Sequence, residues 1–234
     1  MRRRQERHRP CYQLCAYSVA LFALFNIACD APTAARPTFA YDPTTLSRGL
    51  LYRWPSGSKI AIWVDLAASP EGSGPLSLAL AVREGIATWN RVPLFAEYTL
   101  VHAESVADAN VIVFDRATSL PIAPGDCTFD GQNSAGYTYF CPVGSSPFSA
   151  QRFTLASGAA SQATVIIRVD RGRVTDQRAY SNLIVHELGH ALGIGAHSDQ
   201  ATDVMFGAPR VGTLSKRDIQ TLRYVLGQRA DITL

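Results

Sequence analysis

The sequence lacks the charge excess that marks nucleic-acid-binding proteins. Its 22 basic residues barely outnumber its 19 acidic ones, for a formal net charge of +3. Five arginines and one glutamate of that total lie in the first 28 residues. The remainder therefore carries 17 basic and 18 acidic residues, a net charge of −1. We expect no basic surface and no nucleic-acid partner.

The N-terminal apolar stretch is too short to span a bilayer. Residues 14–28 form an apolar run of about 15 residues, whereas a membrane span needs about 20. The run follows a cluster of arginines, which is the arrangement of a secretory signal peptide. Residues 1–28 are therefore predicted to be a signal peptide and the protein to be exported.

Cys29 directly follows this stretch. The pair Ala28-Cys29 resembles the cleavage point of a bacterial lipoprotein signal, although Asn26 stands where such signals usually have Leu. Lipidation of Cys29 predicts an envelope lipoprotein, with the membrane contacted only through the leader or lipid. The alternatives are conventional cleavage, which gives a secreted, extracellular protein, and a retained N-terminal helix. Residues 29–48, rich in Ala, Pro and Thr, are predicted to be a flexible tether.

Cysteine is scarce beyond the leader. Cys11 and Cys15 belong to the leader, which leaves Cys127 and Cys141 besides Cys29. In an exported protein this pair is a candidate disulfide. It would close a loop of about 15 residues, worth about 3 kcal/mol in the chain-entropy picture. The alternative is two buried free thiols.

One short segment concentrates the chemistry: residues 186–199 read HELGHALGIGAHSD. His186 and His190 are four residues apart, so a helix places both on one face, with Glu187 beside them. Gly193 can end that helix in a left-handed turn, after which the chain can return His197 as a third nitrogen ligand. Three protein ligands leave a position for water, as in catalytic rather than structural zinc sites.

The predicted chemistry is hydrolysis by a metal-activated water. Zinc lowers the pKa of bound water from ~15.7 to ~7 and polarises a carbonyl group. Glu187 is placed to act as general base and then as general acid. The alternative is a helix with two surface histidines; Gly193, His197 and the later Met205 argue against it.

This segment resembles the active site of the metzincin clan, whose pattern is HExxHxxGxxH followed by a Met-turn. It is most similar to the matrixins, the matrix-metalloproteinase-like group, and their bacterial relatives. Residues 203–206 resemble the Met-turn, with Met205 as the apolar floor beneath the metal. The resemblance includes Trp89, residues 107–114 and residues 214–227. It implies a metzincin-like α+β fold and a monomeric zinc endopeptidase that binds protein or peptide substrates in extended form.

Two departures from the family pattern stand out. The family places its third histidine where this chain has Ala196, and His197 follows one residue later. We interpret this as a one-residue insertion accommodated by unusual backbone angles at Gly195. The alternative is that His197 is a loop residue and that Asp199 or water completes the metal shell. Phe206 replaces the tyrosine that many relatives have after the methionine.

Further metals find little support in the sequence. Matrixins often carry a second, structural zinc, but only His8 and His102 remain, too few to build it. Calcium is possible by the resemblance and is unplaced. Asp126, Asp130 and Asp170 are the candidates, and each is otherwise a turn residue.

The periodicity of apolar residues predicts an α+β fold with a mixed twisted sheet, an active-site helix and a C-terminal helix, as one domain over residues 49–234. We expect strands at 59–66, 94–101, 110–114, 136–141 and 163–169, and helices at 78–89, 179–192 and from Ser215, which with Asp218 resembles a capping box. A long loop region is expected over residues 121–157. Within it, residues 136–140 are a candidate edge strand that pairs with substrate; the alternative is an ordinary hairpin.

Two other functions compete with peptide hydrolysis. A catalytically silent, zinc-stabilised peptide-binding module would have no need of Glu187. A structural envelope lipoprotein would need a closed zinc shell of four protein ligands. The sequence offers three histidines, and Asp199 is the candidate for the fourth ligand.

Overall fold

The computed structural model describes residues 38–47, 49–65, 76–115, 134–140, 151–154, 160–230 and 232. All of these residues belong to one compact unit, Pro37–Leu234. Cys29, Cys127, Cys141, Asp126 and Asp130 lie outside the described residues, so their proposed roles stay predictions. In the described part of the chain, no helix has the length and apolar character needed to cross a membrane.

A five-stranded mixed sheet with the order β2-β1-β3-β7-β4 forms the centre of this unit. Its strands are β1 (Ser58–Val64), β2 (Tyr98–His102), β3 (Val111–Asp115), β4 (Gly136–Phe140) and β7 (Val165–Val169). The first four strands in the sheet order run parallel, and β4 pairs antiparallel with β7. β3 and β7 are buried throughout, as expected for central strands with apolar sequences. A separate antiparallel pair joins β5 (Gln151–Thr154) to β6 (Ala160–Ala163).

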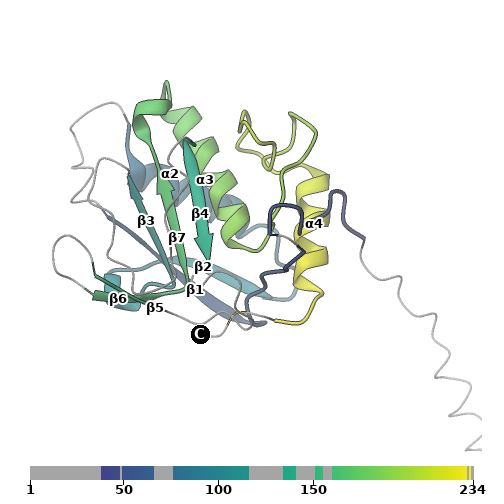
Figure 1. Cartoon of the computed structure of the whole chain (residues 1–234), viewed down its shortest axis with the longest axis horizontal. Helices are drawn as coiled ribbons and strands as arrows, with labels where there is room; N and C mark the ends of the chain where they lie inside the picture. Colours follow the sequence, from purple (N-terminus) through teal and green to yellow (C-terminus); the bar gives the residue numbers. More distant parts are fainter. Residues whose placement is uncertain are drawn as a thin grey trace, which may run out of the picture. The chain divides into compact units, whose positions relative to one another are not determined.

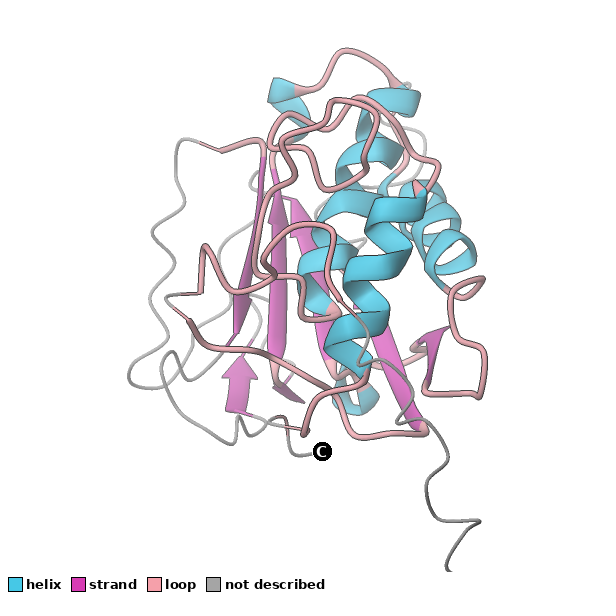
Figure 2. Ribbon diagram, turned by 90° about the vertical axis from the view of Figure 1, so that its right-hand side faces the viewer, coloured by secondary structure: helices cyan, strands magenta, loops and turns pink. Residues whose placement is uncertain are grey.

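Helices cover one face of the large sheet (Figures 1 and 2). They are α2 (Leu78–Trp89) and α3 (Gln177–Ala191), and a third helix, α4 (Lys216–Leu226), adds Leu222 and Val225 to the same apolar core. α2 and α3 pack closely because Gly85 has no side chain; a Cβ there would lie 2.6 Å from Leu188 Cδ1. The opposite face carries a smaller apolar cluster around Ile112, Phe114 and Ile166. Two short 3₁₀ helices, Val106–Asp108 and Arg171–Arg173, complete the described elements.

The structure confirms the α+β class and most of the expected elements. The predicted strand over residues 94–101 is wrong at its start, since β2 begins at Tyr98. The preceding residues bend because the Glu97 carboxylate accepts hydrogen bonds from the backbone N–H groups of Leu94 and Phe95. The strand expected at 163–169 is β7, which begins at Val165, whereas Ala163 ends the separate strand β6; β5 lies inside the expected loop region. The N-cap of α2 is Ser77, whose hydroxyl accepts from Leu80 N.

Part of the expected tether packs on the domain. Ala40 N donates to Thr221 Oγ1 on α4 over 3.2 Å, and the Tyr41 hydroxyl donates to Asp218 Oδ1 over 2.9 Å. The ring of Phe39 packs edge to face against the ring of Tyr224 on α4, with the ring centroids 4.9 Å apart. Residues 38–41, the first part of an N-terminal segment of residues 38–47, therefore lie against α4.

Candidate metal centre

Helix α3 carries the first two histidines of the motif. It begins after Asp176, whose carboxylate accepts a hydrogen bond from Ala179 N over 2.8 Å and so caps the first turn. The helix ends where Gly193 adopts a φ of +103°. A side chain at Gly193 would collide with the carbonyl oxygen of Tyr52, so this turn requires glycine.

The chain then returns past α3 and presents His197. Ser198, the next residue, is fixed by a hydrogen bond from its N–H to Met205 O of 2.7 Å and by a hydroxyl contact to Asp203. The return loop is thus tied to residues 203–205. This arrangement brings His197 to the two histidines of α3.

The prediction that Gly195 adopts an unusual backbone angle is wrong, because its φ is not in the left-handed region. Gly195 is instead a point of close approach. A Cβ there would lie 2.9 Å from Pro43 O, and Gly195 O accepts from Leu46 N over 2.7 Å. The N-terminal segment therefore supports the loop in which Ala196 and His197 lie.

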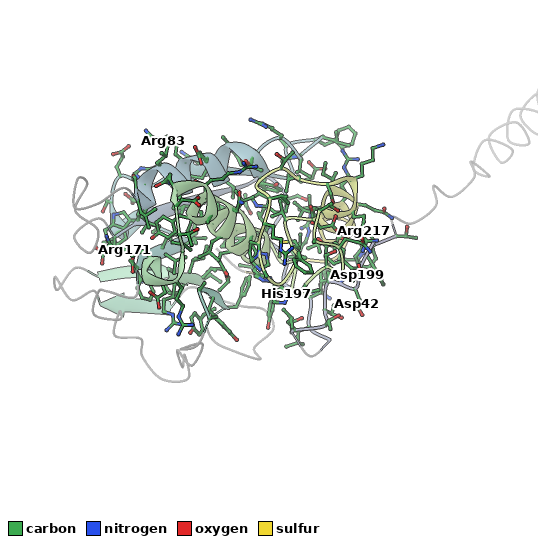
Figure 3. All side chains as sticks on the ribbon, turned by 90° about the horizontal axis from the view of Figure 1, so that it is seen from above. Asp42, Arg83, Arg171, His197, Asp199 and Arg217 are labelled. Carbon is green, nitrogen blue, oxygen red and sulfur yellow. The ribbon has the colours of Figure 1, made fainter. Side chains whose placement is uncertain are left out.

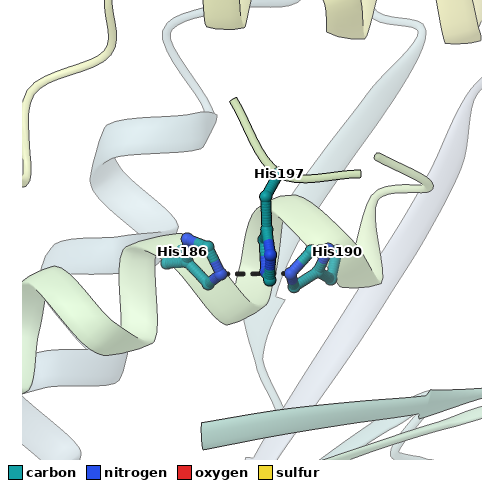
Figure 4. Close-up of side chains that lie close together, drawn as sticks. All are labelled: His186, His190 and His197. Carbon is teal, nitrogen blue, oxygen red and sulfur yellow. Dashed lines mark hydrogen bonds between the residues drawn. The ribbon is translucent and has the colours of Figure 1, made fainter. Parts of the chain in front are cut away.

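The three imidazoles face one another (Figure 4), and their ligand atoms all lie within 4.8 Å. His186 Nδ1 lies 2.8 Å from Val204 O, and His190 Nδ1 lies 2.6 Å from Ile194 O. A carbonyl oxygen only accepts hydrogen bonds, so each Nδ1 carries the hydrogen of its neutral ring. Each Nε2 then carries no hydrogen and has a free lone pair, and the two Nε2 atoms are 3.1 Å apart.

This donor set fits a metal ion such as zinc. Two bare nitrogens that face each other at 3.1 Å repel unless a cation lies between them. Tetrahedral zinc with Zn–N distances of about 2.0–2.1 Å places its ligand nitrogens about 3.3–3.4 Å apart. Burial lowers the pKa of His190 to about 4 and holds the pKa of His186 well below its usual range. Both rings are therefore neutral near pH 7, as metal ligation requires.

Glu187 lies beside the histidines and is only 3% exposed. Burial raises its pKa to about 7, against the opposing effects of the Thr138 hydrogen bond and the charge of Arg168. Thr138 Oγ1 donates to Glu187 Oε2 over 2.7 Å. A Cβ at Gly136 would lie 2.9 Å from Glu187 Cδ, so β4 packs directly on the carboxylate. The sequence predicts β4 but neither of these contacts, because no spacing links residues 136 and 138 to Glu187.

Met205 is fully buried next to the helical turn between the two α3 histidines. Gly189, in that turn, has no side chain; a Cβ there would collide with Met205 Sδ and lie 2.7 Å from Trp89 Cζ2. Met205 therefore packs against the helix that carries both histidines. The neighbouring Val204 adds the carbonyl that orients His186.

Asp218 is a fully buried carboxylate for which the sequence pattern predicts only a capping role. The expected capping box with Ser215 is present at the start of α4. Asp218 also accepts from Val204 N over 3.0 Å and from Met205 N over 3.3 Å, and from the Tyr41 hydroxyl. It therefore connects residues 204–205, α4 and the N-terminal segment.

Asp199, the alternative metal ligand, is engaged elsewhere. Its carboxylate lies 2.6 Å from Arg217 Nη2, and Arg217 Nε lies 2.9 Å from Asp203 Oδ2 (Figure 3). Asp170, the described calcium candidate, accepts from the backbone after it and pairs with Arg173. Among the described residues, the three histidines form the one group of His, Cys, Asp or Glu side chains that could hold a metal ion.

Comparison of the chain with protein-family models finds no match, and comparison with curated proteins finds none either. The function is therefore inferred from the side chains and their geometry.

Proposed function

We propose that this chain is an exported, zinc-dependent endopeptidase of the metzincin clan, similar to the matrixins. The observation that carries the proposal is the convergence of three histidine ligand atoms within 4.8 Å of one another, beside a buried glutamate. A pure metal-binding or structural site would not need that carboxylate. The α+β fold, with the histidines on a helix packed on a mixed sheet, is compatible with the proposal.

In this proposal His186, His190 and His197 hold the zinc ion. When bound, the metal lowers the pKa of its water toward about 7 and polarises the scissile carbonyl. Glu187 takes a proton from the attacking water and gives it to the leaving amine. Thr138 fixes Glu187 Oε2, and Oε1 lies on the side of Gly136.

Extended peptide is the substrate that the sheet suits best. β4 lies at the edge of the sheet in the described part of the chain, and it lies along α3 (Figure 1). Its residues contact Glu187, so a peptide added along this strand would pass the proposed catalytic carboxylate. Met205 supports the histidines from beneath without a place in the substrate path.

In this proposal the N-terminal region and the cysteines have the roles that the sequence predicts for them. Residues 1–28 direct export, and Cys29 carries a lipid. Cys127 and Cys141 form a disulfide, as two cysteines of an exported protein commonly do. The partners are peptides or proteins in extended form, and the enzyme acts as a monomer.

The test uses the unit Pro37–Leu234, which retains the segment packed on α4. A quenched fluorescent peptide library is incubated with wild type, Glu187→Ala and the control Glu84→Ala, whose parent is an exposed acid on α2. We expect cleavage by wild type and by Glu84→Ala, sensitivity to chelators, and loss of cleavage in Glu187→Ala. Zinc content should stay at about one ion per chain in all three, as for a three-histidine site. Zinc binding without cleavage by wild type would overturn the proposal and indicate a silent binding module.

A further inference from the structure

The connection between α2 and β2 exposes two adjacent apolar side chains. Leu94 is 61% exposed and Phe95 is 86% exposed, the highest values among the large apolar side chains that the structure describes as exposed. Single exposed apolar residues are common and need no explanation. Leu94 and Phe95 are adjacent in the chain and together form a small exposed apolar tip.

The tip, residues 94–95, is held in place by its own connection. Glu97 Oε2 accepts from the N–H groups of both Leu94 and Phe95 over 3.0 Å. Ala96 has a φ of +54°, which is costly for a residue with a side chain. Glu97 O accepts from Gly57 N over 2.9 Å, which ties the connection to the start of β1. Because the backbone is braced in this way, the two side chains stay turned toward solvent.

Exposed cationic side chains lie on the segments next to this connection. Arg91 lies shortly before it in the same connection and is exposed. Lys59 is exposed on β1 and pairs in register with Thr99, just beyond the connection. Arg223 on α4 is close enough for its charge to act on Glu97. The Glu97 carboxylate itself is turned toward the backbone amides from which it accepts.

We propose that this tip inserts into the interfacial layer of an anionic lipid surface, with these cations against the lipid headgroups. Interfacial binding combines Phe or Leu side chains in the acyl boundary with Lys or Arg at the headgroups. A stable protein interface needs about 800 Å² from each partner, far more than two side chains supply. A lipid surface has no such requirement, since a few apolar side chains and an electrostatic attraction suffice. The proposal does not depend on peptidase activity.

The test measures binding of the full chain to phosphatidylcholine vesicles with and without phosphatidylserine. Leu94→Ser/Phe95→Ser is compared with wild type and with the control Leu46→Ser, whose parent side chain is 55% exposed on the N-terminal segment. The leader is common to all variants, so the ratio of partition coefficients isolates the tip. We expect the double variant to bind phosphatidylserine vesicles about tenfold more weakly and the control to bind as wild type does.

A second readout places the tip itself. Phe95→Trp and the control Leu46→Trp are titrated with vesicles that contain brominated lipid. Quenching should be strong at position 95 and weak at position 46, and high salt should reduce it. Equal quenching at both positions, or equal vesicle binding by wild type and the double variant, would overturn the proposal. So would a change of oligomeric state in the double variant without loss of vesicle binding, because the tip would then be a protein interface.

Discussion

Substitution of Gly136 by alanine tests whether β4 holds the catalytic carboxylate in position. A Cβ at Gly136 would lie 2.8 Å from Leu183 Cδ1 and 2.9 Å from Glu187 Cδ, and closer still to Glu187 Oε1. Ordinary contact requires about 3.4 Å or more, so Glu187 must shift by roughly 0.5–1 Å. A misplacement of about 1 Å can cost about 100-fold in rate. The overpacking should also cost about 1–3 kcal/mol of stability.

The assay compares Gly136→Ala with Gly85→Ala at equal zinc content. A Cβ at Gly85 would lie 2.6 Å from Leu188 Cδ1, so this control overpacks the same helix without touching Glu187. We expect kcat to fall about 100-fold in Gly136→Ala, and much less in Gly85→Ala at a similar loss of stability. Equal kcat in both variants would refute the argument that β4 positions the carboxylate.

Three further predictions concern the metal centre and its support. Asp218→Ala should lower the free energy of unfolding by about 3 kcal/mol in urea denaturation, since the N–H groups of Val204 and Met205 lose a buried acceptor; a loss below about 1 kcal/mol would contradict this. His197→Ala should weaken zinc binding at least about tenfold in competition with a chromogenic chelator, whereas Asp199→Ala should leave the affinity unchanged. Weaker zinc binding by Asp199→Ala than by His197→Ala would make Asp199 the ligand. Removal of zinc by a chelator should lower the melting temperature, because zinc at about 1,000 times its Kd stabilises by about 4 kcal/mol; an unchanged melting temperature would contradict a site formed only on folding.

The sequence predicts best where spacing along one element decides the geometry. His186 and His190 share a helix face by the period of the α-helix, and the capping box of Ser215 and Asp218 follows from their separation. The requirement for glycine at position 193 also follows from the motif, and the structure shows the positive φ.

Contacts between distant segments could not be predicted in this way. The pairing of Thr138 with Glu187 joins a strand to a helix 49 residues later. The support of Gly195 by Leu46 depends on how the N-terminal segment crosses the domain, which no local pattern encodes. The chain bends at Leu94 instead of continuing the expected strand, because the Glu97 side chain accepts hydrogen bonds from the backbone N–H groups of Leu94 and Phe95.

In the proposed site, three histidines of this chain hold one zinc ion. X-ray absorption at the zinc edge, on wild type and on His197→Ala, tests it most directly. We predict three imidazole nitrogens and one non-protein oxygen in wild type, and the loss of one imidazole in the variant. Four protein ligands in wild type, or an unchanged imidazole count in His197→Ala, would contradict it.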